Sequence, residues 1–214
     1  MIDTLSNYLQ YGFVQRAFIA GSFIALVCAV LGVFLVLRKM SLIGDGLAHV
    51  SFGAIALGLF INVMPFYFAL LVVGLAALAI MGLEQSERLS GDTAIGIVSA
   101  VGIAGGVVLA SLAGGFNVDL FSYLFGSILA ISPQEVWLAI GLSFLVLLVL
   151  TVFYWDMFLL TFDQDYAQIS GVKIKLVNSI LAVLTALVVV MAVRLVGVMP
   201  VSYTHLTLPT KRIV

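Results

Sequence analysis

Residues 17–37 read AFIAGSFIALVCAVLGVFLVL, an apolar run without a charged side chain that Arg38 and Lys39 bring to an end. A helix needs about 20 predominantly apolar residues to cross the hydrocarbon core of a bilayer, and this run is long enough. Because a bilayer offers no water to backbone N–H and C=O groups, a helix, which pairs them internally, is the expected form. The run therefore predicts that the chain crosses a membrane as a helix.

Runs of the same kind follow along the chain. The uncharged stretch 46–83 is too long for one helix, and the sequence NVMP at 62–65 interrupts it where a tight turn would fall. We therefore predict two spans there, at 47–61 and 66–83. The remaining predicted spans lie at 92–113, 136–155 and 176–199. The sequence thus predicts an all-α, polytopic membrane helix bundle of about six transmembrane helices.

The composition agrees with this fold class. Of the 214 residues, 64% are hydrophobic and 9% are charged, whereas an average soluble domain carries about 25% charged residues. The formal net charge of −1 gives no basic excess and argues against a nucleic-acid partner. The single cysteine, Cys28, excludes a disulfide framework and a cysteine-based zinc site within one chain. Lipid is therefore the expected solvent for most of the surface.

Residues 119–132 are apolar but short, and we predict a re-entrant or interfacial helix there rather than a full crossing. The distribution of Lys and Arg supports this choice. If the end at Arg38 is cytoplasmic, Arg88, Lys173 and Lys175 fall on the same side only when 119–132 does not cross.

Asp45 and His49 stand four residues apart where the second span begins. On a helix this spacing places both side chains on one face, and an oxygen donor beside a nitrogen donor suits a first-row divalent ion such as zinc or manganese. Ionisable residues in a membrane segment are candidates for function because burying them is costly. In a second interpretation, Asp45 caps the helix N-terminus and His49 donates to a neighbouring carbonyl.

The segment 161–175 is the longest polar stretch on the side that we assign to the cytoplasm. It predicts a short helix that ends at Gly171. The small residues Ala167 and Gly171 would let another protein approach the backbone closely. A plain solvated connector is the alternative interpretation.

Four blocks in order resemble the permease subunit of bacterial zinc and manganese ABC importers. The first is VFLVLRKMSLIGDGLAH at 33–49, followed by NVMPFY at 62–67 and VDLFSYLFGS at 118–127. The fourth is the polar loop 163–175, which runs into RLVGV at 194–198. The resemblance extends over residues 13–199, and four ordered blocks are far more specific than any single motif.

The resemblance implies a permease in the bacterial cytoplasmic (inner) membrane, without catalytic activity of its own. Its implied partners are a second permease copy, forming a homodimer, cytoplasmic ATPase subunits and an extracytoplasmic metal-binding protein. Asp45 and His49 match the pair that contacts the transported zinc or manganese ion, and no permanently bound cofactor is expected. The loop carrying Asp163, Asp165, Ala167 and Gly171 matches the helix that couples the permease to the ATPase.

The resemblance ends near residue 200, so we interpret 1–200 as the permease domain, incomplete at its C-terminus. The tail VSYTHLTLPTKRIV at 201–214 differs abruptly in composition and is interpreted as non-native, which excludes His205 as a ligand. Three alternatives differ in what they require. A membrane scaffold without a transport role predicts that Asp45 and His49 face outward or that the pair serves only as a cap. A permease for iron chelates or a vitamin needs a wide pathway rather than two small ligands, and an intramembrane metal-dependent enzyme needs a third ligand or a nucleophile nearby.

Overall fold

The computed structural model of the chain describes residues 10–85, 90–112, 125–126 and 132–197. Its helices are α2 (Gly12–Leu37), α3 (Ile43–Phe60), α4 (Pro65–Gln85), α5 (Gly91–Leu112), α7 (Pro133–Val152), α8 (Tyr154–Phe162), α9 (Gln164–Ile169) and α10 (Ile174–Val196). No strand occurs within these described residues. The predicted all-α fold is confirmed.

Six of the helices are long and apolar enough to cross a membrane: α2, α3, α4, α5, α7 and α10. Each coincides with one of the six predicted spans, with ends that differ by a few residues. Most of the predicted interfacial segment 119–132 lies outside the described residues, and so does the tail 201–214. The division of the chain at residue 200 therefore stays a prediction.

The largest difference from the sequence prediction lies after α7. A single span was predicted to run to residue 155, but α7 ends at Val152 and the chain turns at Phe153 into the separate helix α8. No glycine or proline marks this turn. Met157 and Leu160 of α8 are buried, so packing against the rest of the bundle, which no local pattern encodes, accounts for the change of direction.

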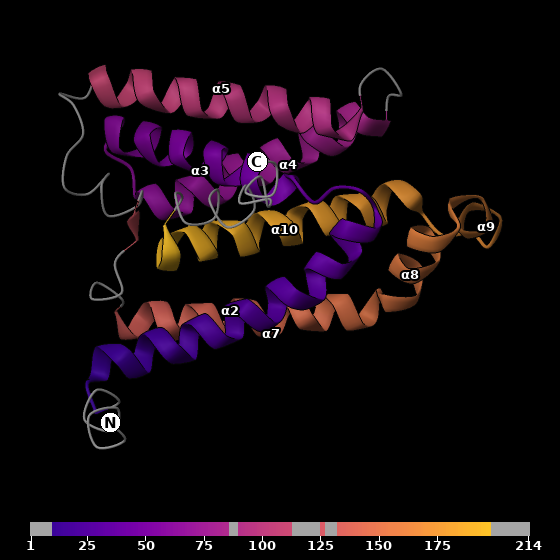
Figure 1. Cartoon of the computed structure of the whole chain (residues 1–214), viewed down its shortest axis with the longest axis horizontal. Coiled ribbons are helices and arrows are strands. Elements are labelled where there is room, and N and C mark those ends of the chain that lie inside the picture. The colour runs from indigo at the N-terminus through magenta and orange to yellow at the C-terminus, as the bar shows by residue number, and fades with distance from the viewer. Residues whose placement is uncertain (1–9, 86–89, 113–124, 127–131, 198–214) are drawn as a thin grey trace, which may run out of the picture.

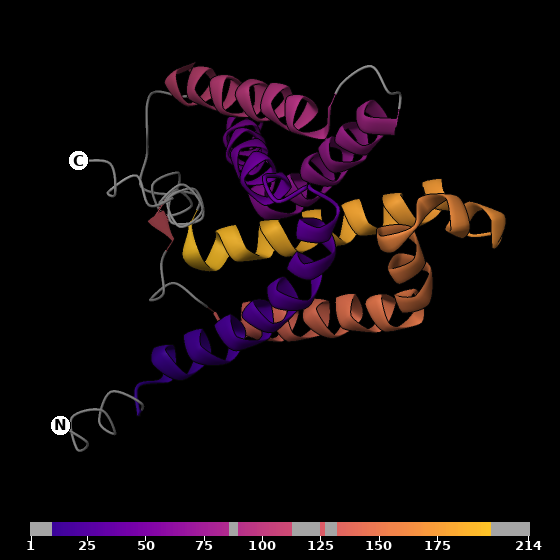
Figure 2. The ribbon, with the colours of Figure 1, turned by 45° about the vertical axis from the view of Figure 1, so that its right-hand side comes forward.

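The helices α3 and α10 form the centre of the bundle. Most of each is buried, whereas α5 buries only a narrow face. Figures 1 and 2 show α5 lying along α3, with α2 and α7 side by side on the other side of α10. Cys28 is exposed on α2, because this helix buries one stripe only.

The close approach of α3 and α5 depends on glycines. A Cβ added at Gly53 of α3 would collide with the backbone carbonyl of Gly102 on α5, and one at Gly102 would lie 2.7 Å from the Cα of Val50. At Gly106 an added Cβ would lie 2.7 Å from the ring of Phe52. Gly102 and Gly106 stand four residues apart on α5, and their lack of side chains lets α3 and α5 approach closely.

Polar contacts hold both ends of α10. At its first turns, the Asn178 Oδ1 accepts a hydrogen bond of 2.6 Å from Nη2 of Arg38, the residue that follows α2. Near its last turn, Nη2 of Arg194 lies 2.6 Å from Oε1 of Glu135 in the first turn of α7. Glu135 also forms a capping box with Ser132.

Candidate functional site

The pair Asp45 and His49 lies at the beginning of the central helix α3. The chain leaves α2 through Lys39, whose φ of 58° turns the backbone sharply, and α3 begins at Ile43. Asp45 is in the first turn and His49 one turn further in. The neighbouring Leu47 and Ala48 are completely buried, so these tightly packed residues fix the direction of the helix face that carries the pair.

The two side chains face each other as their spacing predicts. His49 Nε2 lies 3.6 Å from Asp45 Oδ2, and the side chains are 22% and 23% exposed, respectively. The pair is thus partly buried in a helix whose other faces pack against α4, α5 and α10. A carboxylate and an imidazole placed in this way can contact one small divalent cation from one side.

Within the described residues, no group of three or more His, Cys, Asp and Glu side chains lies close enough to hold a metal ion. Among the described residues, a metal ion placed at this pair would meet two ligand side chains, those of Asp45 and His49. Few protein ligands suit an ion in transit, because an ion that must leave cannot sit in a closed cage. Asp45 also stands in the first turn of α3, where the helix dipole favours an anion, but Leu42 occupies the N-cap position and its side chain makes no capping hydrogen bond.

The polar loop contains the predicted short helix. Asp163 precedes α9, and its side chain accepts a hydrogen bond of 2.8 Å from the backbone N–H of Tyr166. The helix ends at Ile169, and Gly171 follows with a φ of 83°, a conformation that favours glycine. The sequence prediction of a short helix ended by Gly171 is confirmed.

Of the four residues of the polar loop that the sequence assigns to contact with another protein, three are exposed and one is buried. Asp163, Asp165 and Gly171 are exposed, and an added Cβ at Gly171 would meet nothing within 4 Å. Ala167 is completely buried and belongs to the main hydrophobic core. Its side chain seats α9 on the bundle and does not face outward toward another protein.

Two residues of α9 that sequence reasoning did not single out are prominent. Ile169 is 85% exposed and Tyr166 is 56% exposed. The signal in the sequence was an aromatic and a β-branched aliphatic residue set among the polar residues of 163–171. Exposed apolar side chains at the tip of a short helix are suited to insertion into a pocket of another protein.

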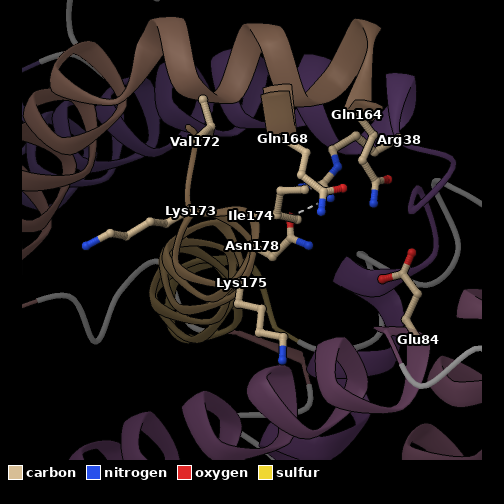
Figure 3. A pocket seen from close by; sticks show the side chains of 9 residues that line it. All are labelled: Arg38, Glu84, Gln164, Gln168, Val172, Lys173, Ile174, Lys175 and Asn178. Carbon is tan, nitrogen blue, oxygen red and sulfur yellow. Dashed lines mark hydrogen bonds between the residues drawn. The ribbon is translucent and has the colours of Figure 1, made fainter. Parts of the chain in front are cut away.

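A cavity of about 690 Å³ opens beside α9. It lies where α2 and α4 end and α10 begins, and Figure 3 shows its side chains. They are Arg38, Glu84, Gln164, Gln168, Val172, Lys173, Ile174, Lys175 and Asn178. Burial lowers the pKa of the Arg38 guanidinium below its usual range, and the nearby Glu84 carboxylate offsets part of this decrease. Arg38 stays charged, because a guanidinium does not lose its proton in proteins.

Comparison with known proteins identifies a family that this chain matches. The model of the ABC 3 transport family matches residues 10–211. The manganese transport system membrane protein MntC of Halalkalibacterium halodurans is 35% identical over 190 residues, which cover 89% of this chain and 65% of that protein. The high-affinity zinc uptake system membrane protein ZnuB of Haemophilus influenzae is 34% identical over 187 residues, covering 87% and 71%.

A solved structure, PsaBC from Streptococcus pneumoniae in complex with Fab, has the same fold. Its TM-score is 0.79 at 32% sequence identity, and the match covers 93% of this chain and 72% of that chain. The chain spans about two thirds of the length of the relatives that it matches.

Proposed function

Because the chain belongs to the ABC 3 transport family, we propose that it is the permease subunit of an ATP-driven importer for a divalent metal ion, manganese or zinc. The names of its relatives support this class of cargo. The observation that carries the proposal within the chain is the Asp45–His49 pair on the central helix, with Nε2 and Oδ2 3.6 Å apart.

In the proposed transport cycle, the ion enters from the outer side and is held transiently by Asp45 and His49. The carboxylate supplies charge and the imidazole supplies a nitrogen ligand. Movement of the helices then opens the inner side. Two ligands on one helix face bind weakly enough to allow release, which conduction through a pathway requires.

The family is one of ABC transporter permeases, so ATP hydrolysis takes place on a separate subunit. The proposed contact with that ATPase is the exposed surface of α9, where Asp163, Asp165 and Gly171 lie. Ala167 supports α9 from below, and the exposed Tyr166 and Ile169 add apolar anchors to this surface.

The other proposed partners are an extracytoplasmic metal-binding protein and a second copy of the permease, in a bacterial inner membrane. The names of the relatives favour manganese or zinc over iron chelates or a vitamin. The family match and the names of the relatives favour a permease over an intramembrane enzyme.

The test is metal uptake by the permease assembled with its ATPase and binding protein. We expect Asp45→Asn and His49→Gln each to lower uptake of radioactive manganese or zinc by about tenfold or more at equal expression, in line with the loss of metal-site groups. Asp92→Asn is the matched control, because Asp92 is likewise an acidic residue in the first turn of a span, α5.

If Asp45 served only the helix dipole, Asp45→Asn and Asp92→Asn would have equal and small effects on uptake. Unchanged uptake by both pair variants would remove the proposed pathway. A loss of expression in Asp45→Asn alone would instead assign this residue to stability.

A further inference from the structure

Neither Asp45 nor His49 is among the residues that line the cavity beside α9. It is formed by chain segments far apart in the sequence: the end of α2, the end of α4, the polar helix α9 and the beginning of α10. Its volume of about 690 Å³ far exceeds the roughly 30 Å³ that one water molecule occupies in the liquid. It lies at the end of the bundle that the positive-inside rule assigns to the cytoplasm.

Asn178 is the most informative residue of this cavity. The residue is only 5% exposed, and its Oδ1 is occupied by the Arg38 guanidinium at 2.6 Å. This bond fixes the orientation of the carboxamide, and the Nδ2 group makes no hydrogen bond to any described residue. Figure 3 shows Nδ2 directed into the space between α10 and Glu84. A nine-tenths buried residue thus offers an oriented donor to a ligand.

The charges around this donor favour an anion. Arg38 and Lys175 line the cavity with Asn178, and Lys173 lines its edge, where Figure 3 shows its side chain extending away from the others. Among the described residues that line the cavity, Glu84 is the one carboxylate. Arg38 can still donate from the N–H groups that do not bond Asn178.

The beginning of α10 adds to this environment. No side chain caps its N-terminus, and its first turn contains no acidic residue. The first backbone N–H groups of a helix lack intrahelical partners and favour an anion.

We propose that this cavity binds a phosphate group, held by Arg38, Lys175 and the Nδ2 group of Asn178. A planar guanidinium, an ammonium and an amide are ordinary phosphate donors. The position where three membrane helices begin or end suits the headgroup of an anionic phospholipid, and basic pockets between transmembrane helices bind such headgroups. Free phosphate carries the same chemistry, so the experiment separates the two sources.

The experiment is native mass spectrometry of the purified full chain in detergent. The chain is titrated in separate series with phosphatidylglycerol, with diacylglycerol, which lacks the phosphate, and with inorganic phosphate. We expect one molecule of phosphatidylglycerol to remain bound under conditions that remove diacylglycerol. Binding of inorganic phosphate alone would assign the cavity to the free ion and overturn the lipid as its source.

Three variants test the location. Lys175→Gln removes a lining cation and is expected to weaken phosphatidylglycerol binding about fivefold, the contribution of one cation near a membrane surface. Lys39→Gln is the matched control, since Lys39 is exposed at the same end of the bundle but does not line the cavity. Asn178→Asp keeps an oxygen for Arg38 and replaces the donor by an anion, so we expect at least the same loss.

Glu84→Gln should act in the opposite direction, because it removes the like charge that faces the phosphate, and we expect tighter binding. Equal losses in Lys175→Gln and Lys39→Gln would show diffuse attraction to the basic end of the bundle and would overturn the site. Unchanged binding in Asn178→Asp would overturn it as well.

Discussion

Gly53 and Gly102 show how single residues set the spacing of helices in this bundle. A methyl group at Gly53 would collide with the carbonyl of Gly102, which is backbone and cannot rotate away. We expect Gly53→Ala to destabilise the chain by about 1–3 kcal/mol, the usual cost of overpacking. The measurement is the thermal unfolding midpoint of the chain in detergent.

Gly105→Ala provides the control, since a Cβ at Gly105 on α5 would meet nothing within 4 Å. Alanine is favoured over glycine in a helix by about 0.5–1 kcal/mol, so this variant should be neutral or slightly more stable. Equal midpoints for Gly53→Ala and Gly105→Ala would contradict the close packing of α3 and α5.

At the scale of single residues, the sequence predicts how Asp45 and His49 lie relative to each other. The spacing of Asp45 and His49 is enough to place them on one helix face, and the geometry confirms it. The spacing could not give their partial exposure, which depends on how α4, α5 and α10 surround α3. Ala167 is the reverse case: its small size suggested contact with another protein, whereas long-range packing buries it in the chain's own core.

At the scale of elements, α9 combines an inward side chain with an outward apolar tip. Ile169 is 85% exposed, so its truncation removes no internal packing. We expect Ile169→Ser to weaken ATPase binding about tenfold, as the loss of an interface hot spot does, without lowering the unfolding midpoint. A pull-down titration of the ATPase subunit onto the permease measures it.

Val63→Ser is the matched control, since Val63 is a 47% exposed aliphatic residue in the turn between α3 and α4, at the other end of the bundle. It should leave ATPase binding unchanged. Equal affinities of Ile169→Ser and the parent chain would exclude the tip of α9 from the contact.

The start of α7 is joined to the end of α10 by one ion pair. Arg194 approaches Glu135 with Nη2 at 2.6 Å and Nε at 2.8 Å, and both side chains are about one third exposed or less. We expect Arg194→Gln to cost about 1–3 kcal/mol, because a partly buried carboxylate loses its charged partner. Chemical denaturation in mixed micelles measures the change.

Arg16→Gln is the control for this variant, since within the described part of the chain the Nε of Arg16 donates to the backbone carbonyl of Gly12 in its own helix. We expect a change below about 0.5 kcal/mol there. The double variant Glu135→Gln with Arg194→Gln should recover part of the loss. An unaltered stability of Arg194→Gln would show that the capping box alone holds the start of α7.

The sequence located the six long helices because each is a long apolar run, with charged residues absent or close to its ends and with charged or turn-forming residues beyond it. It did not separate α8 from α7, because the turn at Phe153 lies within a continuous apolar stretch. Apolar runs identify a segment that prefers lipid or a core, but they do not say where tertiary packing redirects it. Capping residues, glycine and proline can mark such a change of direction in a sequence. At Phe153 there is no glycine or proline, and no side chain caps the beginning of α8.

At the scale of the whole molecule, α10 connects two groups of helices. It packs against α3 and α4 along its length, and also contacts α2 and α7. Its two polar contacts, Arg38 with Asn178 and Arg194 with Glu135, lie at opposite ends of the membrane span. A helix held at both ends can transmit a movement from the end beside α9 to the opposite end of the bundle.

The charges predict the orientation of the whole bundle, and this prediction can be tested directly. Cys28 is exposed on α2, so Cys28→Ser should be tolerated and gives a cysteine-free background. In it, Ser170→Cys places a thiol beside α9 at the basic end, and Met64→Cys places one in the turn after α3, where Met64 is 70% exposed. A membrane-impermeant maleimide should label Met64→Cys in spheroplasts and Ser170→Cys only in inside-out vesicles without the ATPase. The reverse labelling would put α9 and its neighbouring cavity outside the cell, where no cytoplasmic ATPase could reach them.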